Sequence, residues 1–166
     1  MFNLAILTVS DKGSQGGRED VSGKTIRDML SGESKIIYYE IVPDETDVIA
    51  AKLKEWADGG GVDVILTTGG TGFAPRDVTP EATLLVVDRL APGFAEAMRI
   101  QGFAKTPFAI LSRAAAGIRG NCLIINLPGS PKAVREGLEI ILPTLSHTVG
   151  VLKKEITEHT AGKEGK

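Results

Sequence analysis

The chain has 166 residues, of which 42% are hydrophobic and 24% are charged, and its formal net charge is −2. This length suits one domain that buries a sizeable core. The charge balance argues against a broad basic face for nucleic acid and against a cationic helix on a membrane surface, so we expect neither partner. The first residues carry no basic segment and no cleavage site of small residues, and we expect a cytoplasmic protein that begins with a strand. The single cysteine, Cys122, has apolar neighbours that predict a packed thiol.

The spacing of apolar residues alternates along the chain between the period of strands and that of helices. In chain order it predicts a strand at 3–9, a helix at 21–30, a strand at 35–42, a helix at 47–57, a strand at 62–66, helices at 80–90 and 93–105, a short strand at 108–111, a strand at 121–127 and a long helix from 131. Pro143 should kink the last helix. Ser22 is a candidate cap for the first helix, and the glycines of 58–61 are expected to end the second.

Strands that alternate with helices predict an α/β fold, here a single three-layer α/β/α domain with a mostly parallel sheet. We assign this domain to residues 1–152 and expect the charged tail, 153–166, to be disordered. Ligands of such sheets bind beyond the carboxyl ends of the strands. Five polar loops are expected at that edge, at 8–11, 43–44, 67–77, 112–120 and 126–131.

The most informative segment is the glycine loop, residues 67–72 (TTGGTG), which follows an apolar strand and precedes a helix. We expect Thr79 to be the N-cap of that helix and Pro80 its first helical residue. Its glycines can adopt positive φ and let backbone N–H groups approach an anion. Asp77 adds a hard oxygen ligand for a metal that bridges phosphates. The alternative is a tight turn with Asp77 as a helix cap. The spacing matches neither GxxxxGK[ST] nor GxGxxG, which argues against a P-loop ATPase and a dinucleotide-dependent dehydrogenase.

Four motifs together carry a resemblance to a known family: TTGGTGFAPRDVTPEAT, the upstream VPDE, SRAAAGIRG and NLPGSPKAV. They resemble the MogA and MoaB family of molybdenum cofactor biosynthesis, over residues 3 to about 152. The resemblance implies the molybdenum cofactor biosynthesis protein fold. It also implies molybdopterin adenylyltransferase activity, in which Mg²⁺ and ATP serve to transfer AMP to the terminal phosphate of molybdopterin with release of pyrophosphate.

The resemblance also implies roles for individual residues. Asp44 and Asp77 match the family's magnesium-associated acidic residues, so we expect them to be catalytic and to hold the metal. Nucleotide and phosphate contacts are expected at Gly69, Gly70, Thr71, Gly72, Ser112, Gly117, Pro128, Gly129 and Ser130. Pterin contacts are expected at Thr8, Ser10 and Asp11. Four cationic side chains are candidates to meet the phosphates: Arg76, Arg113, Arg119 and Lys132.

The residues fit such a reaction independently of the resemblance. A phosphomonoester has a second pKa near ~6, so the attacking oxygen is already ionised at neutral pH and no general base is required. Accordingly, the only histidines, His147 and His159, fall outside the polar loops. The chemical difficulty is repulsion between anions, which a divalent cation, backbone N–H groups and arginine or lysine relieve.

Two other functions are alternatives to this one. The first is a non-catalytic, MoaB-like pterin-binding or scaffold protein, against which the pair Asp44 and Asp77 argues. The second is another nucleotide-dependent enzyme of the deamidase or pyrophosphatase type, against which the lack of a further domain argues. The family resemblance suggests a homo-oligomer, a trimer or a hexamer, and a downstream molybdate-inserting enzyme as a partner. The sequence leaves open whether the pathway inserts molybdenum or tungsten.

Overall fold

A computed structural model describes residues 1–154. Its six-stranded sheet has the order β2-β1-β3-β6-β5-β4. The four strands β2, β1, β3 and β6 are parallel, whereas β5 runs antiparallel to both of its neighbours. The strands are β1 Phe2–Val9, β2 Ser34–Val42, β3 Val64–Thr68, β4 Arg89–Leu90, β5 Ala116–Arg119 and β6 Cys122–Leu127. The predicted α/β class with a mostly parallel sheet is therefore confirmed.

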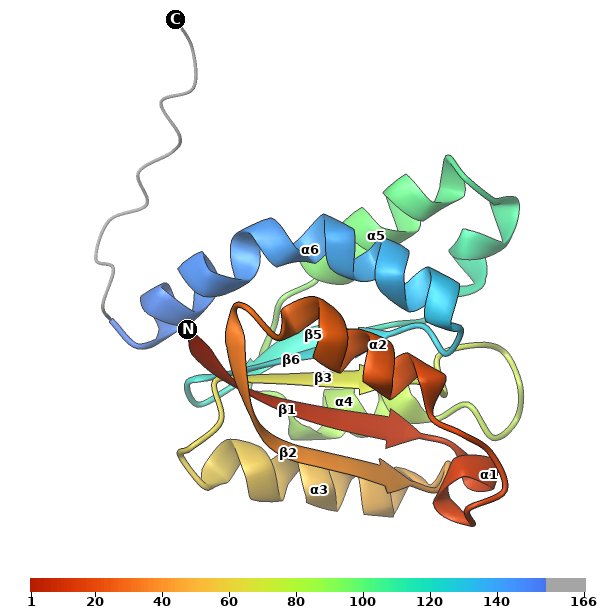
Figure 1. Ribbon diagram of the computed structural model, residues 1–166, viewed down its shortest axis with the longest axis horizontal. Coiled ribbons are helices and arrows are strands. Elements are labelled where there is room, and N and C mark those ends of the chain that lie inside the picture. Colours follow the sequence, from red (N-terminus) through yellow and green to blue (C-terminus); the bar gives the residue numbers. More distant parts are fainter. Residues whose placement is uncertain (155–166) are drawn as a thin grey trace, which may run out of the picture.

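Helices cover both faces of this sheet (Figure 1). Helices α2, α5 and α6 lie over one face, and α3 and α4 lie over the other. The helices are α1 Asp11–Ser14, α2 Val21–Leu30, α3 Thr46–Asp58, α4 Thr79–Val86, α5 Gly93–Phe103, the 3-10 helix η1 Pro107–Leu111 and α6 Pro131–Leu152. None of the helices within residues 1–154 is long and apolar enough to cross a membrane.

Strand β1 shows how one strand serves two hydrophobic cores. Leu4 and Ile6 point toward α2 and α6, while Ala5 and Leu7 point toward α3. All four side chains are fully buried. Because neighbouring residues of a strand face opposite sides, a strand that is apolar throughout must be covered on both faces. The cores thus hold the central strands rigidly, and the polar loops at their carboxyl ends inherit fixed positions.

The expected helix at 80–90 is shorter in the structure. It ends at Val86, and the chain then joins the sheet as β4. Asp88 N donates to Ile118 O at 2.8 Å, and Ala91 N donates to Ala116 O at 2.9 Å. Pairing with β5 therefore replaces the last helical turn, and tertiary contacts override the local helical spacing.

The expected strand at 108–111 is wrong, because this segment forms η1. Pro107 opens the turn, and Thr106 Oγ1 accepts a hydrogen bond from Phe108 N at 3.4 Å. Phe108 and Ile110 are 74% and 60% exposed, so the short apolar run is not a buried strand. Apolar runs of four residues do not by themselves distinguish a strand from a helical turn.

The expected loop at 112–120 contains β5. Gly120 adopts a φ of 56° and, with Asn121, forms the two-residue turn of the β5–β6 hairpin. The start of β5 thus lies at the carboxyl edge of β6, and the hairpin turn lies at the opposite edge of the sheet. Residues 116–120 therefore run away from the carboxyl edge of the sheet, where the whole loop 112–120 was expected.

The structure also bears on expectations for a short helix, the cysteine, Pro143 and the tail. The helix α1 was not predicted. Cys122 is 1% exposed, and burial raises the pKa of its thiol to about 12, as expected for a packed cysteine. Helix α6 continues through Pro143. His159 and most of the predicted disordered tail, 155–166, lie outside the described residues.

Candidate functional site

A cavity of about 460 Å³ lies at the carboxyl edge of β1, β2, β3 and β6. Eight residues with a predicted site role line it: Thr8, Ser10, Asp44, Gly69, Gly70, Asp77, Gly129 and Ser130. Its lining also includes residues for which no ligand-binding role was predicted, among them Gly13, Arg18, Glu19, Asp20 and Ser22. The structure thus brings loops from four parallel strands together around one space, as parallel topology requires.

The glycine loop is held in a conformation that only glycine adopts easily. Gly69 and Gly70 have φ values of 95° and 68°. A Cβ on Gly69 would lie 2.3 Å from Val9 O, and one on Gly70 would lie 2.3 Å from Thr79 Oγ1. The bare backbone of these residues therefore forms one wall of the cavity, where N–H groups are accessible to an anion.

Thr79 closes this loop rather than capping the helix. Its Oγ1 donates to Gly69 O at 2.9 Å, and its N donates to Gly70 O at 3.0 Å. The predicted N-cap role of Thr79 is wrong, because α4 begins at Thr79 itself and the preceding Val78 offers no capping side chain. The two hydrogen bonds satisfy both carbonyl groups and leave the N–H side of the loop for a ligand.

Arg113 holds the second half of the loop. Its backbone N donates to Thr71 O at 2.8 Å, its Nε donates to Gly72 O at 2.7 Å and its Nη2 donates to Asp77 O at 2.6 Å. The same guanidinium forms an ion pair with Glu81. Each of its three guanidinium nitrogens thus already has a protein acceptor, so the contacts of Arg113 orient the loop.

Asp11 and Asp44 join the first two loops of this edge reciprocally. Asp11 N donates to Asp44 Oδ2 at 2.8 Å, and Asp44 N donates to Asp11 Oδ1 at 3.0 Å. Arg76 binds Asp11 through two hydrogen bonds of 3.0 and 2.8 Å. This contact lowers the pKa of Asp11. Asp11 and Arg76 therefore neutralise each other outside the cavity lining, although both were predicted to meet ligands.

Asp44 is the carboxylate whose environment most favours a cation. Burial, and secondarily the negative charges of Asp11 and Asp77, raise its pKa. Among residues 1–154, its Oδ1 has no hydrogen-bond donor, and this atom would lie 3.2 Å from a Cβ on Gly70. A half-buried carboxylate oxygen beside a second carboxylate and the glycine loop fits a magnesium ion that also binds phosphates.

Asp77 stands at the other end of the glycine loop. Its Oδ2 accepts a hydrogen bond from Ala74 N at 3.0 Å and would lie 2.8 Å from a Cβ on Gly72. Within residues 1–154, no three His, Cys, Asp or Glu side chains form a group that could hold a metal. Asp44 and Asp77, two carboxylates that line the cavity, match in number the usual protein share for a Mg²⁺ ion that also binds substrate phosphates and water.

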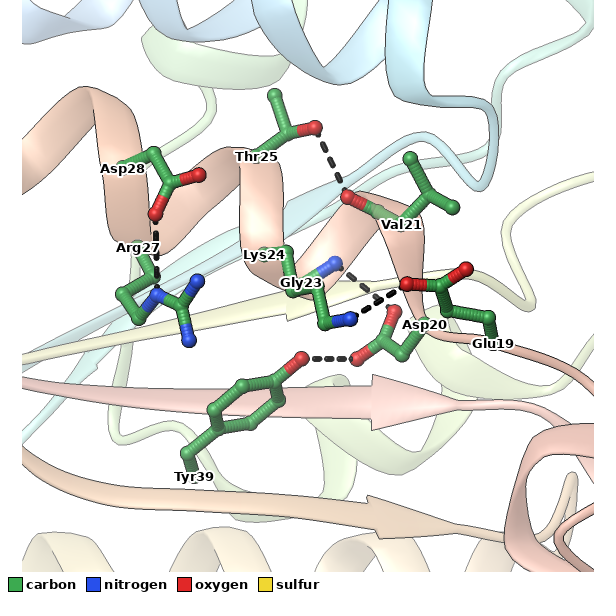
Figure 2. Close-up of polar contacts among 9 residues, drawn as sticks. All are labelled: Glu19, Asp20, Val21, Gly23, Lys24, Thr25, Arg27, Asp28 and Tyr39. Carbon is green, nitrogen blue, oxygen red and sulfur yellow. Dashed lines mark hydrogen bonds and ion pairs between the residues drawn. The ribbon is translucent and has the colours of Figure 1, made fainter.

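Asp20 lies at the start of α2 and was missed by the sequence analysis. Figure 2 shows its carboxylate between the N-terminus of α2 and Tyr39. Gly23 N donates to Oδ1 at 2.9 Å, while Tyr39 OH and Thr8 Oγ1 each donate to Oδ2 at 2.6 Å. Asp20, and not the predicted Ser22, is therefore the N-cap of α2. The only signal in the sequence was an aspartate directly before the helical segment 21–30, because aspartate is a preferred N-cap residue.

Several residues with predicted roles lie elsewhere. Ser112 and Pro128 line a separate cavity of about 420 Å³ beside α5, η1 and α6. Gly117 lies within β5, where a Cβ would come within 2.6 Å of Val87. Arg119 pairs with Asp58 at the opposite edge of the sheet. Lys132 is exposed, and Thr71 and Gly72 follow the part of the glycine loop that lines the cavity.

Comparisons with known proteins agree with this architecture. Residues 5–147 match the family described as "probable molybdopterin binding domain". A molybdopterin adenylyltransferase of Helicobacter pylori (strain ATCC 700392 / 26695) is 46% identical over 154 residues, covering 91% of this chain and 88% of the relative. The molybdopterin adenylyltransferase of Escherichia coli K12 is 41% identical, covering 83% of this chain and 72% of the relative.

Solved structures give the same result. The molybdopterin biosynthesis enzyme MoaB of Thermus thermophilus superimposes with a TM-score of 0.88 at 54% identity, covering 93% of this chain and 98% of that one. The tungsten cofactor synthesizing protein MoaB of Pyrococcus furiosus has a TM-score of 0.82 at 40% identity, covering 93% and 96%. The glycine loop, the cavity-lining carboxylates of Asp44 and Asp77, and these matches together show that the chain belongs to the MogA and MoaB family of molybdenum cofactor biosynthesis proteins.

Proposed function

We propose that this protein is a molybdopterin adenylyltransferase that uses Mg²⁺ and ATP to transfer AMP to the terminal phosphate of molybdopterin, releasing pyrophosphate. The observation that carries the proposal is the position of Asp44, a half-buried carboxylate with a raised pKa, beside Asp77 and the glycine loop in one cavity. Relatives that carry this activity in their names are 41–46% identical over most of the chain.

The residues of the cavity would share the work of bringing two polyanions together. The N–H groups of Gly69 and Gly70 would bind nucleotide phosphate oxygens, and Asp44 and Asp77 would hold the magnesium ion. Magnesium, when bound, would neutralise charge on the triphosphate and on the pyrophosphate that leaves. Arg113 and Thr79 would keep the loop in the geometry that binds. The attacking phosphate needs no base, because it is ionised at neutral pH.

Further parts of the proposal concern the protein's setting. A cytoplasmic location suits an enzyme whose substrates are ATP and a phosphorylated pterin. Self-association suits the exposed apolar side chains along α5 and η1, including Ile100, Phe103 and Phe108, because patches of this kind commonly mark interfaces. A trimer or hexamer is the expected assembly, and an enzyme that inserts the metal is the expected downstream partner.

The decisive experiment incubates the purified protein with molybdopterin, ATP and Mg²⁺. Adenylylated pterin and pyrophosphate should appear in equal amounts, and chelation of the divalent cation should stop both. Tight pterin binding without any turnover would instead indicate the pterin-binding scaffold, the second candidate, which the presence of both Asp44 and Asp77 in the cavity disfavours.

A further inference from the structure

The hydroxyl groups around the cavity fall into two kinds, according to where their single proton goes. Thr8, Ser22 and Thr68 donate theirs to protein acceptors: Asp20 Oδ2 at 2.6 Å, Gly129 O at 2.7 Å and Pro128 O at 2.6 Å. A hydroxyl that has given its proton to the protein can offer a ligand only lone pairs. All three residues line the cavity.

Ser10 and Ser130 have the opposite polarity. Each accepts a hydrogen bond from a backbone N–H, Ser10 Oγ from Gly13 N at 3.0 Å and Ser130 Oγ from Ala133 N at 3.2 Å. Within residues 1–154, neither hydroxyl donates to a protein acceptor, so both keep a proton for a ligand. Protons of this kind, like the N–H groups of the glycine loop, suit phosphate oxygens.

Asp20 fixes the first kind of polarity at the point where α2 begins. Its two contacts with hydroxyl groups, both 2.6 Å, have the length of hydrogen bonds to a charged acceptor. Burial and then the contact with Asp20 raise the pKa of Tyr39, so this phenol keeps the proton that it donates to Asp20. The side chains of Thr8, Asp20 and Ser22, which we call the α2 corner, can therefore only accept hydrogen bonds.

We propose that Asp20 is a specificity-determining positioning residue that makes the α2 corner a receptor for the N–H-bearing edge of the pterin ring. This inference rests on the proposed function. The pyrimidinone edge of a pterin presents two adjacent donors, the ring N3–H and the 2-amino group, whereas adenine presents a donor beside an acceptor nitrogen. A corner of acceptors therefore fits the pterin better than the nucleotide base, and leaves the glycine loop, Ser10 and Ser130 to the phosphates.

The test compares two fluorescent rings, 6-hydroxymethylpterin and 6-hydroxymethyllumazine, which differ in having an amino group or a carbonyl oxygen at position 2. Fluorescence titration of the wild-type protein should show a preference for the pterin of about tenfold or more, since lumazine sets an acceptor against acceptors. Thr8→Val should remove most of this preference, and Thr8→Ser, which keeps the hydroxyl, should retain it.

Asp20→Asn gives the sharpest outcome. Its amide oxygen can still accept from Gly23 N, which turns the amide N–H groups toward Thr8 and Tyr39. Thr8 would then accept from the protein and present its proton to the cavity, so the preference should fall and shift toward lumazine. Tyr39→Phe is the matched control, because it loses a hydrogen bond to the same carboxylate oxygen but leaves the Thr8 contact, and it should keep the pterin preference.

The outcomes separate this inference from the proposed function. Equal affinity of the wild-type protein for both rings, no binding of either, or an unchanged preference in a folded Asp20→Asn variant would overturn the inference, even if AMP transfer is observed. A clear pterin preference that inverts in Asp20→Asn would support it, even if the wild-type protein fails to transfer AMP. Circular dichroism establishes that each variant is folded.

Discussion

The two walls of the cavity are built by different means. The glycine loop is a backbone wall, shaped by positive φ angles at Gly69 and Gly70 and by hydrogen bonds to their carbonyl groups. The α2 corner is a side-chain wall, in which Asp20 collects donors from β1, from β2 and from the start of α2. A backbone wall tolerates almost no added atoms. A side-chain wall tolerates side chains of similar shape, but it loses its ligand when the direction of its hydrogen bonds is reversed.

The largest expected effect comes from the charge beside the backbone wall. Asp77→Asn keeps the size of the side chain and an oxygen that can accept from Ala74 N, but it removes the negative charge that a hard cation needs. Turnover should fall by about 10² to 10³, the range for loss of a key electrostatic group, with little change in stability. Steady-state AMP transfer and thermal unfolding measure the two quantities. Asp47→Asn, an exposed change in the first turn of α3, should leave both unchanged.

The backbone wall itself should fail when a side chain is added. Gly70→Val places a Cβ 2.3 Å from Thr79 Oγ1, closer than the two atoms can approach, and strains a φ of 68°. ATP affinity, measured by calorimetry, should fall by about 10² or more, while pterin affinity stays within a few-fold because the α2 corner is untouched.

The control for this variant uses the same strain in another place. Gly60 has a φ of 75°, and a Cβ on it would meet no atom within 4 Å. Gly60→Val should therefore destabilise the fold but leave ATP affinity as it is. Equal losses of ATP and pterin affinity in Gly70→Val would show that the two walls do not act separately.

A smaller effect is expected from Arg113. Arg113→Lys keeps a positive charge but cannot reach Gly72 O, Asp77 O and the Glu81 carboxylate at once, so the glycine loop should lose rigidity. We expect KM for ATP to rise by about tenfold with a smaller change in kcat, as for lost positioning. Arg119→Lys is the matched control, because its contacts with Asp58, Val86 O and Asp88 involve no residue of the cavity lining. A change confined to kcat would argue that Arg113 acts directly on the reacting phosphate.

The smallest effect concerns acid stability. Arg76 lowers the pKa of Asp11, so this pair contributes stability above the ordinary carboxyl pKa, and the contribution disappears as the pH falls through the lowered value. Arg76→Gln should lower the melting temperature slightly at pH 7 and by less at pH 2. Thermal unfolding at both pH values measures the difference. A larger loss at low pH than at pH 7 would contradict this account.

The sequence predicted the backbone wall better than the side-chain wall for a physical reason. Glycines, prolines and strand-forming residues act locally, so the loop at 67–77 and the parallel strands before it could be predicted directly. Asp20 acts through Thr8 and Tyr39, which are 12 and 19 residues away and become neighbours only when the sheet forms. The antiparallel strand β5 was missed for a similar reason, because its hydrogen bonds come from β4 and β6.

The arginines illustrate the same limit. Sequence reasoning could place Arg76, Arg113 and Arg119 near phosphates by their position in motifs, but the structure gives each of them a carboxylate partner. Arg18 lines the cavity without an ion pair among residues 1–154, and no motif pointed to it. Which basic side chain remains available to a phosphate depends on the ion pairs that all the others form, and these are a property of the whole fold.

The hydrogen bond from Ser22 to Gly129 joins positions 107 residues apart. During synthesis, strands β1, β2 and β3 can pair early. The part of the cavity lining formed by Gly129 and the start of α6 can form only after the last quarter of the protein has been made. Domains fold as their segments emerge during synthesis, so an incomplete chain still lacks part of the cavity lining. Substrate binding therefore cannot stabilise that incomplete chain. Ligand binding can therefore favour only the finished fold, and truncated products that lack α6 should be left to proteolysis.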